Sequence, residues 1–195
     1  MNPASTIARS ELILGGQKSG KSRRAELLAR QWLAQSPTHR ALLLATGQAW
    51  DVEMQERIAR HQRERAERVP GLLTVEEPYA LAATLARVSS PQVLVVIDCL
   101  TLWLTNLLMP GEESEPNKPL APDWQAQAAT LLVAIEQAPG PVLLVGNEIG
   151  LGVIPLGREV RAFVDALGQL NQQVAHTCAR VTLMVAGQPL TVKQS

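Results

Sequence analysis

Short apolar runs of strand length alternate with longer stretches of helical composition along the chain. The candidate strands are residues 12–14, 41–45, 72–75, 93–97, 142–145 and 181–185, and the expected helices cover about 21–34, 51–68, 79–88, 101–108, 124–137 and 158–180. Parallel neighbouring strands need a crossover connection, which a helix usually supplies. The alternation therefore predicts an α/β fold with a mostly parallel central sheet covered by helices on both faces.

Two stretches refine this picture. The run Val93–Ile97 has no polar alternation, which indicates a central strand buried on both faces. Residues 110–122, rich in Pro and Glu, interrupt the rhythm and predict a solvated loop, either a mobile lid or a variable connection. We expect one domain over residues 1–195, with residues 1–10 forming a flexible extension.

Composition narrows the class of protein. Lys plus Arg, at 18, balances Asp plus Glu, at 18, so no overall basic field attracts nucleic acid. The cysteines, Cys99 and Cys178, lack metal-ligand spacing and are expected to be free buried thiols in a reducing compartment. No apolar run reaches the roughly 20 residues needed to cross a bilayer. We expect a cytoplasmic protein without a membrane span.

A phosphate-binding turn follows the first candidate strand. Gly15, Gly20, Lys21 and Ser22 satisfy the P-loop spacing G-x-x-x-x-G-K-[ST], and Gly16, Gln17, Lys18 and Ser19 fill the positions between them. In such a turn the backbone N–H groups cradle phosphates, the lysine reaches the β and γ phosphates, and the hydroxyl binds Mg²⁺. The sequence thus predicts a P-loop NTPase-like fold that binds ATP or GTP with Mg²⁺.

A second metal ligand is expected where a buried strand ends. Asp98 directly follows Val93–Ile97, so it can bind Mg²⁺ together with Ser22, although a carboxylate there can also simply cap the next helix. Asn147 and Glu148 also follow a strand, at the edge where open α/β sheets place ligands. They can line the site, sense the γ-phosphate or close a turn.

Several ordered blocks resemble the bifunctional adenosylcobinamide kinase / adenosylcobinamide-phosphate guanylyltransferase family of cobalamin biosynthesis. The likeness runs nearly end to end and is carried by Ile13–Arg23, Ala45–Gln48, Asp51–His61, Thr74–Glu76, Asp98–Leu108, Asn147–Pro155 and Arg161–Gln172. The most distinctive block is Asn147–Pro155, which reads N-E-I-G-L-G-V-I-P. Members often place a proline soon after the position of Arg65, whereas Ala66–Val69 intervene here, which predicts a longer helix.

The resemblance implies a specific pair of reactions. The enzyme phosphorylates the aminopropanol hydroxyl of adenosylcobinamide, then transfers GMP from GTP to adenosylcobinamide phosphate through a guanylylated histidine, giving adenosylcobinamide-GDP. The histidine corresponds to His61. The resemblance also implies a homotrimer and further nucleotide-site residues at Thr46, Gly47, Gln48, Gln62, Arg63, Glu64, Arg65, Glu76 and Asp98.

His61 makes chemical sense as a nucleophile. Arg57, His61 and Arg65 recur every fourth residue, so an ideal helix places them on one face suited to a polyphosphate. Neighbouring guanidinium groups disfavour a second positive charge, which leaves the imidazole neutral and able to attack phosphorus. The competing interpretation is a solvated charged helix face on which His61 is inert.

Two other functions compete with this interpretation. One is a simple P-loop kinase of another small alcohol with no covalent guanylyl step. The other is a nucleotide switch, which the absence of an N-K-x-D run makes the weaker alternative, since the corresponding strand exit reads Asn147-Glu148-Ile149-Gly150.

Overall fold

The structure is a computed structural model that describes residues 7–48, 52–108 and 124–195, with the backbone alone described at residues 52–54, 57, 58 and 61. The strands are β1 (Ser10–Gly15), β2 (Arg40–Ala45), β3 (Leu72–Glu76), β4 (Val93–Asp98), β5 (Val142–Val145), β6 (Arg180–Val185) and β7 (Gln188–Gln194). The helices are α1 (Lys21–Gln35), α2 (Val52–Arg68), α3 (Leu81–Val88), α4 (Leu100–Leu108), α5 (Trp124–Gln137) and α6 (Arg158–Thr177).

One sheet organises these elements in the order β3-β2-β4-β5-β1-β6-β7. Every neighbouring pair is parallel except β6 and β7, which form an antiparallel hairpin at one edge. As expected, β4 is a central strand, and Leu94, Val95, Val96 and Ile97 are buried. The predicted α/β class with a mostly parallel sheet is confirmed.

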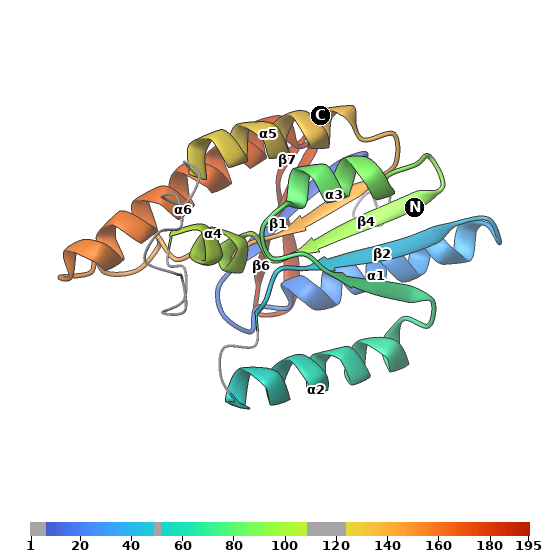
Figure 1. Ribbon diagram of the computed structural model, residues 1–195, viewed down its shortest axis with the longest axis horizontal. Helices are drawn as coiled ribbons and strands as arrows, with labels where there is room; N and C mark the ends of the chain where they lie inside the picture. Colours follow the sequence, from blue (N-terminus) through green and yellow to red (C-terminus); the bar gives the residue numbers. More distant parts are fainter. Residues whose placement is uncertain (1–6, 49–51, 109–123) are drawn as a thin grey trace, which may run out of the picture.

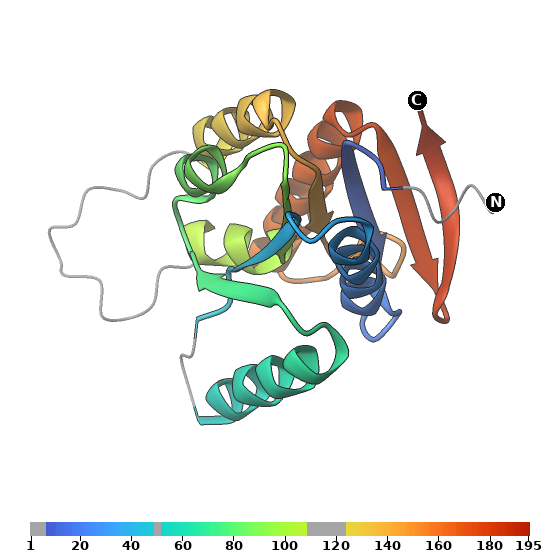
Figure 2. The ribbon, with the colours of Figure 1, turned by 90° about the vertical axis from the view of Figure 1, so that its right-hand side faces the viewer.

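Helices cover both faces of the sheet, as Figures 1 and 2 show. Alternate strand residues such as Leu12, Val95 and Leu144 join the core formed with α3, α4, α5 and α6. Their neighbours Ile13, Val96 and Leu143 point the other way, toward Ala25, Leu28 and Ala29 of α1. The period-2 geometry of a strand thus builds one core on each side of the sheet.

Helix α2 lies at the edge of the sheet and carries few buried side chains among those described. It lies beside β3, the edge strand of the sheet (Figure 2). Among its described side chains only Arg65 is buried, and Val69 directly after the helix is buried as well. The helix continues to Arg68, in agreement with the longer helix that the late proline predicts.

The sequence prediction differs from the structure chiefly at two boundaries and in one missed strand. β1 already begins at Ser10, and the Val142 N–H donates to the Arg9 carbonyl at 3.0 Å, so the expected extension over residues 1–10 is too long. α6 ends at Thr177 instead of Arg180, because Arg180 pairs with Glu11 in the sheet. β7 was not predicted at all. Residues 1–6 and the whole predicted loop 110–122 lie outside the described residues.

None of the helices that the structure describes is long and apolar enough to cross a membrane.

Candidate functional site

The phosphate-binding turn occupies the place that its motif predicts, between β1 and α1. Gly15 closes the strand, Lys21 begins the helix, and Gly20 caps the helix in a left-handed conformation with φ 101°. Inside the turn the Ser19 N–H donates to the Gly16 carbonyl at 3.3 Å. The N-terminus of a helix carries partial positive charge and unpaired N–H groups, so this end of α1 favours an anion.

Glycine is required at the start of the turn. Gly15 has φ 153°, and a Cβ there would lie 2.5 Å from the Ser19 Oγ and 2.6 Å from the Met184 carbonyl oxygen. The latter atom belongs to the backbone of β6 and cannot move aside cheaply. The turn is also fixed from outside, since the Gly187 N–H donates to the Ser19 carbonyl at 3.0 Å and the Glu148 N–H to the Gly15 carbonyl at 3.1 Å.

Lys21 folds back over the turn. Its Nζ donates to the Gly16 carbonyl at 2.7 Å. Burial lowers the pKa of Lys21, while the nearby Cys99 and Asp98 act in the opposite direction. Asp98 therefore lies close enough to Lys21 to interact electrostatically, although β5 lies between β1 and β4 in the sheet.

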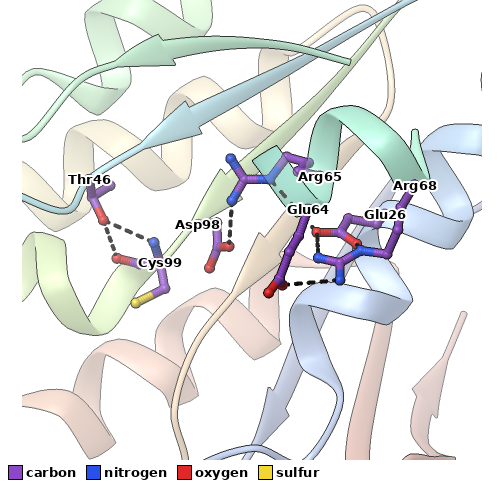
Figure 3. A network of polar contacts seen from close by, with 7 residues as sticks. All are labelled: Glu26, Thr46, Glu64, Arg65, Arg68, Asp98 and Cys99. Carbon is purple, nitrogen blue, oxygen red and sulfur yellow. Dashed lines mark hydrogen bonds and ion pairs between the residues drawn. The ribbon is translucent and has the colours of Figure 1, made fainter. Parts of the chain in front are cut away.

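The exit of β4 is locked by a buried threonine. The Thr46 Oγ1 donates to the Cys99 carbonyl at 2.8 Å and accepts from the Cys99 N–H at 2.9 Å, as Figure 3 shows. The Thr46 N–H also donates to the Asp98 carbonyl at 3.1 Å, and the Asn106 amide holds the Thr46 carbonyl at 2.8 Å. Thr46 thus orders the Asp98 backbone, and its own side chain is not directed at an open site.

The last turn of α2 is tied to this region by charge. The Arg65 Nη2 lies 3.9 Å from the Asp98 Oδ2, and the Arg65 Nε lies 3.7 Å from the Glu26 Oε1. Glu26, on α1, also accepts from the Arg68 Nε at 2.8 Å and Nη2 at 3.1 Å. Figure 3 shows Glu26 between both arginines. Glu64 is exposed and pairs with Arg68 at 3.3 Å.

A separate cleft of about 360 Å³ opens between α2 and the ends of β2 and β3. It is lined by Gly47, Gln48, Gln55, Ala59, Gln62, Glu76 and Pro78. The site residues predicted from the resemblance thus fall into two groups. The phosphate-binding turn, Asp98 and Arg65 lie together, whereas Gly47, Gln48, Gln62 and Glu76 line the cleft. Arg63 is exposed and is not among the cleft residues.

His61 belongs to α2, one turn before Arg65. Its backbone is described, but its side chain lies outside the described residues. The side chain of Arg57 also lies outside the described residues. The remaining histidines do not resemble nucleophiles: His39 stacks on Trp32 with ring centroids 3.7 Å apart, and His176 is exposed at the end of α6.

The thiols are buried, as predicted. Burial raises the pKa of Cys99 to about 11 and that of Cys178 to about 12. Thiols held in the protonated form are poor nucleophiles, so neither competes with His61 for that role.

Among the described residues, no group of three or more His, Cys, Asp or Glu side chains is arranged to hold a metal ion. Proteins usually bind Mg²⁺ through one or two oxygen-bearing side chains together with substrate phosphates. Ser22 at the start of α1 and Asp98 at the exit of β4 fit such a partial ligand set. Glu26 was not singled out from the sequence, because its pairing with α2 joins residues that are distant in the chain.

The sequence of the chain matches one known protein family over nearly its full length. The family described as cobinamide kinase / cobinamide phosphate guanyltransferase matches residues 11–192. The chain belongs to this family. It is 47% identical to the bifunctional adenosylcobalamin biosynthesis protein CobP of Pseudomonas aeruginosa, over 94% of this chain and 96% of that protein. It is 34% identical to the bifunctional adenosylcobalamin biosynthesis protein CobU of Escherichia coli, over 93% of this chain and 98% of that protein.

Membership confirms the resemblance drawn from the sequence blocks and makes the protein a transferase of cobalamin biosynthesis. A solved structure, the flagellar accessory protein FlaH of Methanocaldococcus jannaschii, superposes with a TM-score of 0.53 at 11% identity, over 97% of this chain and 80% of FlaH. At that identity the likeness concerns the fold alone.

Proposed function

We propose that the chain phosphorylates the aminopropanol hydroxyl of adenosylcobinamide and then transfers GMP from GTP to the resulting phosphate, with His61 carrying the GMP. The observation that carries the proposal is the meeting of the phosphate-binding turn, Lys21 and Asp98 in a member of this family. Cobinamide substrates, ATP and GTP follow from the family's two activities.

In the kinase step the substrate hydroxyl attacks the γ-phosphorus, loses its proton to water and displaces the nucleoside diphosphate. The N-terminus of α1 and Lys21 are placed to stabilise the charge that develops on the phosphate oxygens. Ser22 and Asp98 would hold Mg²⁺, which would neutralise charge on the phosphates when bound.

In the transfer step a neutral His61 nitrogen attacks the α-phosphorus of GTP, and pyrophosphate leaves. The phosphate of adenosylcobinamide phosphate then attacks the phosphoramidate, which releases the imidazole and yields adenosylcobinamide-GDP. The cleft beside α2 supports nucleotide contacts at Gly47, Gln48, Gln62 and Glu76, since these residues line one hollow next to the helix that carries His61.

Two variants separate the steps. Lys21→Ala is expected to abolish both activities, because both need an immobilised polyphosphate. His61→Ala is expected to retain phosphorylation and lose adenosylcobinamide-GDP formation. Chromatography of products from cobinamide with ATP and GTP measures both. If His61→Ala forms the GDP-linked product at the wild-type rate, His61 does not carry GMP and the covalent mechanism is wrong.

We further propose a homotrimer in the cytoplasm. An exposed apolar run after β5 supports a subunit contact: Leu151 is 82%, Val153 96%, Ile154 76% and Leu156 97% exposed. Patches of this kind commonly mark interaction surfaces. Sedimentation equilibrium should give three times the chain mass of 21.1 kDa. A mass of one chain at micromolar concentration contradicts the trimer.

A further inference from the structure

The side chain of Glu26 has no place in the reactions described above, yet it is almost fully buried. Its side chain is 6% exposed and lies on α1, five residues after Lys21. A buried carboxylate is costly unless cations and hydrogen-bond donors compensate it. Here Arg68 supplies two hydrogen bonds, at 2.8 and 3.1 Å, and Arg65 adds an ion pair at 3.7 Å.

Both cations come from the last turn of α2. Among the described side chains of that helix, Arg65 alone is buried, and it pairs with Glu26. Glu26 therefore joins the last turn of α2 to the helix that follows the phosphate-binding turn through two cations (Figure 3). Arg65 extends the attachment to Asp98 at 3.9 Å.

This attachment lies on the helix face that includes position 61. Residues 61, 65 and 68 follow the i, i+4, i+7 spacing, which places them on one side of a helix. Because positions 61, 65 and 68 lie within about two turns of one helix, holding its last turn restrains the backbone at position 61. Misplacing a reacting group by about 1 Å can slow a reaction by roughly 100-fold.

We propose that Glu26 is a positioning residue for guanylyl transfer, which holds the helix carrying His61 against the helix of the phosphate-binding turn. The proposal rests on the function proposed above. It places no contact between Glu26 and substrate. Its consequence is selective, since the groups assigned to the kinase step lie on the turn, at the start of α1 and at the exit of β4, and none lies on α2.

The test is single-turnover guanylylation of the full chain with GTP radioactive at the α-phosphate. Glu26→Gln should slow labelling by about 10- to 100-fold, with the KM for GTP and the rate of cobinamide phosphorylation both within about twofold of wild type. Arg68→Gln removes the 45%-exposed partner and should slow labelling in the same direction. The double variant should be no slower than Glu26→Gln alone, because both changes break one attachment.

Matched controls are Arg30→Gln, an exposed charge one turn further along α1, and Glu67→Gln, an exposed charge beside Arg68. Both should label at the wild-type rate. If Glu26→Gln fails to fold, the labelling rate of Arg68→Gln alone tests the proposal. Labelling at the wild-type rate by a folded variant, or an equal loss of kinase and labelling, overturns the proposal.

Hydrogen exchange separates this proposal from the proposed function. Amides of α2 should exchange at least about tenfold faster in Glu26→Gln than in wild type, whatever the chemistry of His61. If wild type takes up no label, the guanylyl mechanism fails and so does the role in transfer. If wild type is labelled but exchange in α2 does not change, the attachment itself is wrong.

Discussion

The phosphate-binding turn rests on a buried ion network whose loss should destabilise the whole domain. Glu11 of β1 is fully buried, and its Oε1 lies 2.9 Å from the Arg24 Nη2 of α1. Its Oε2 lies 3.4 Å from the Arg180 Nη1 of β6, and Thr182 donates to the Oε1 at 2.8 Å. One carboxylate thus joins the strand before the turn, the helix after it and a neighbouring strand.

Glu11→Gln preserves the shape of the side chain and removes its charge. The variant leaves Arg24 and Arg180, with side chains 8% and 6% exposed, near an amide that can accept on one atom only. Removing one partner of a buried ion pair costs about 3–5 kcal/mol of unfolding free energy. In a domain of 150–250 residues each kcal/mol lowers the Tm by about 2–4 °C, so we expect a fall of roughly 6–20 °C.

Urea unfolding followed by circular dichroism measures the loss, provided that the slope with denaturant does not change. Glu136→Gln, an exposed charge on α5, serves as the control and should stay within about 0.5 kcal/mol of wild type. A loss below about 1 kcal/mol for Glu11→Gln refutes the reasoning, since it means that the guanidinium groups do not depend on this carboxylate.

Three further predictions follow from particular contacts. Gly15→Ala should lower nucleotide affinity at least about tenfold in equilibrium dialysis, because the added Cβ would meet the Met184 carbonyl at 2.6 Å; wild-type affinity would contradict the tight approach of β6 to the turn. Lys193→Met should lower the unfolding free energy measured in urea by about 1–2 kcal/mol. The reason is that the Lys193 Nζ donates to three carbonyls at the end of α6, those of Ala175, His176 and Cys178, at 3.0, 2.7 and 2.7 Å. An unchanged unfolding free energy would mean that water replaces these bonds. Although burial alone would raise it, the pKa of Glu77 is lowered from 4.5 by hydrogen bonds from Ala80, Thr84 and Tyr79, with Arg87 contributing. The stability that Glu77 adds is therefore present above pH 4.5 and is lost as pH falls through the lower folded-state pKa. The difference in Tm between wild type and Glu77→Gln should therefore shrink as the pH is lowered. A difference that does not change with pH would contradict the assignment.

Local patterns were sufficient to predict most of the fold. The apolar run Val93–Ile97 indicated a central strand, and the glycine spacing from Gly15 to Ser22 located the phosphate-binding turn. Both signals are contained in short stretches of chain. β7 was not predicted because its side chains are mostly exposed, so Leu190 and Val192 do not indicate a buried strand. In addition, the hairpin turn at Ala186-Gly187 is not a typical turn sequence.

The site was predictable only where a motif or the family resemblance identified it. Asp98 lies near Lys21 because the carboxyl ends of parallel strands share one edge of the sheet, which the strand pattern already implies. Thr46 is a nucleotide-site residue by resemblance, but its hydroxyl is engaged by Cys99. The role proposed for Glu26 depends on its ion pairs with Arg65 and Arg68 of α2, which no local pattern in the sequence encodes.

The central claim is that His61 carries GMP. The most direct measurement is peptide mapping of the protein after reaction with GTP radioactive at the α-phosphate. The account predicts a single acid-labile, base-stable label on the peptide containing His61, which disappears when adenosylcobinamide phosphate is added and adenosylcobinamide-GDP forms. A label on any other residue, or product formation without a labelled protein, would contradict it.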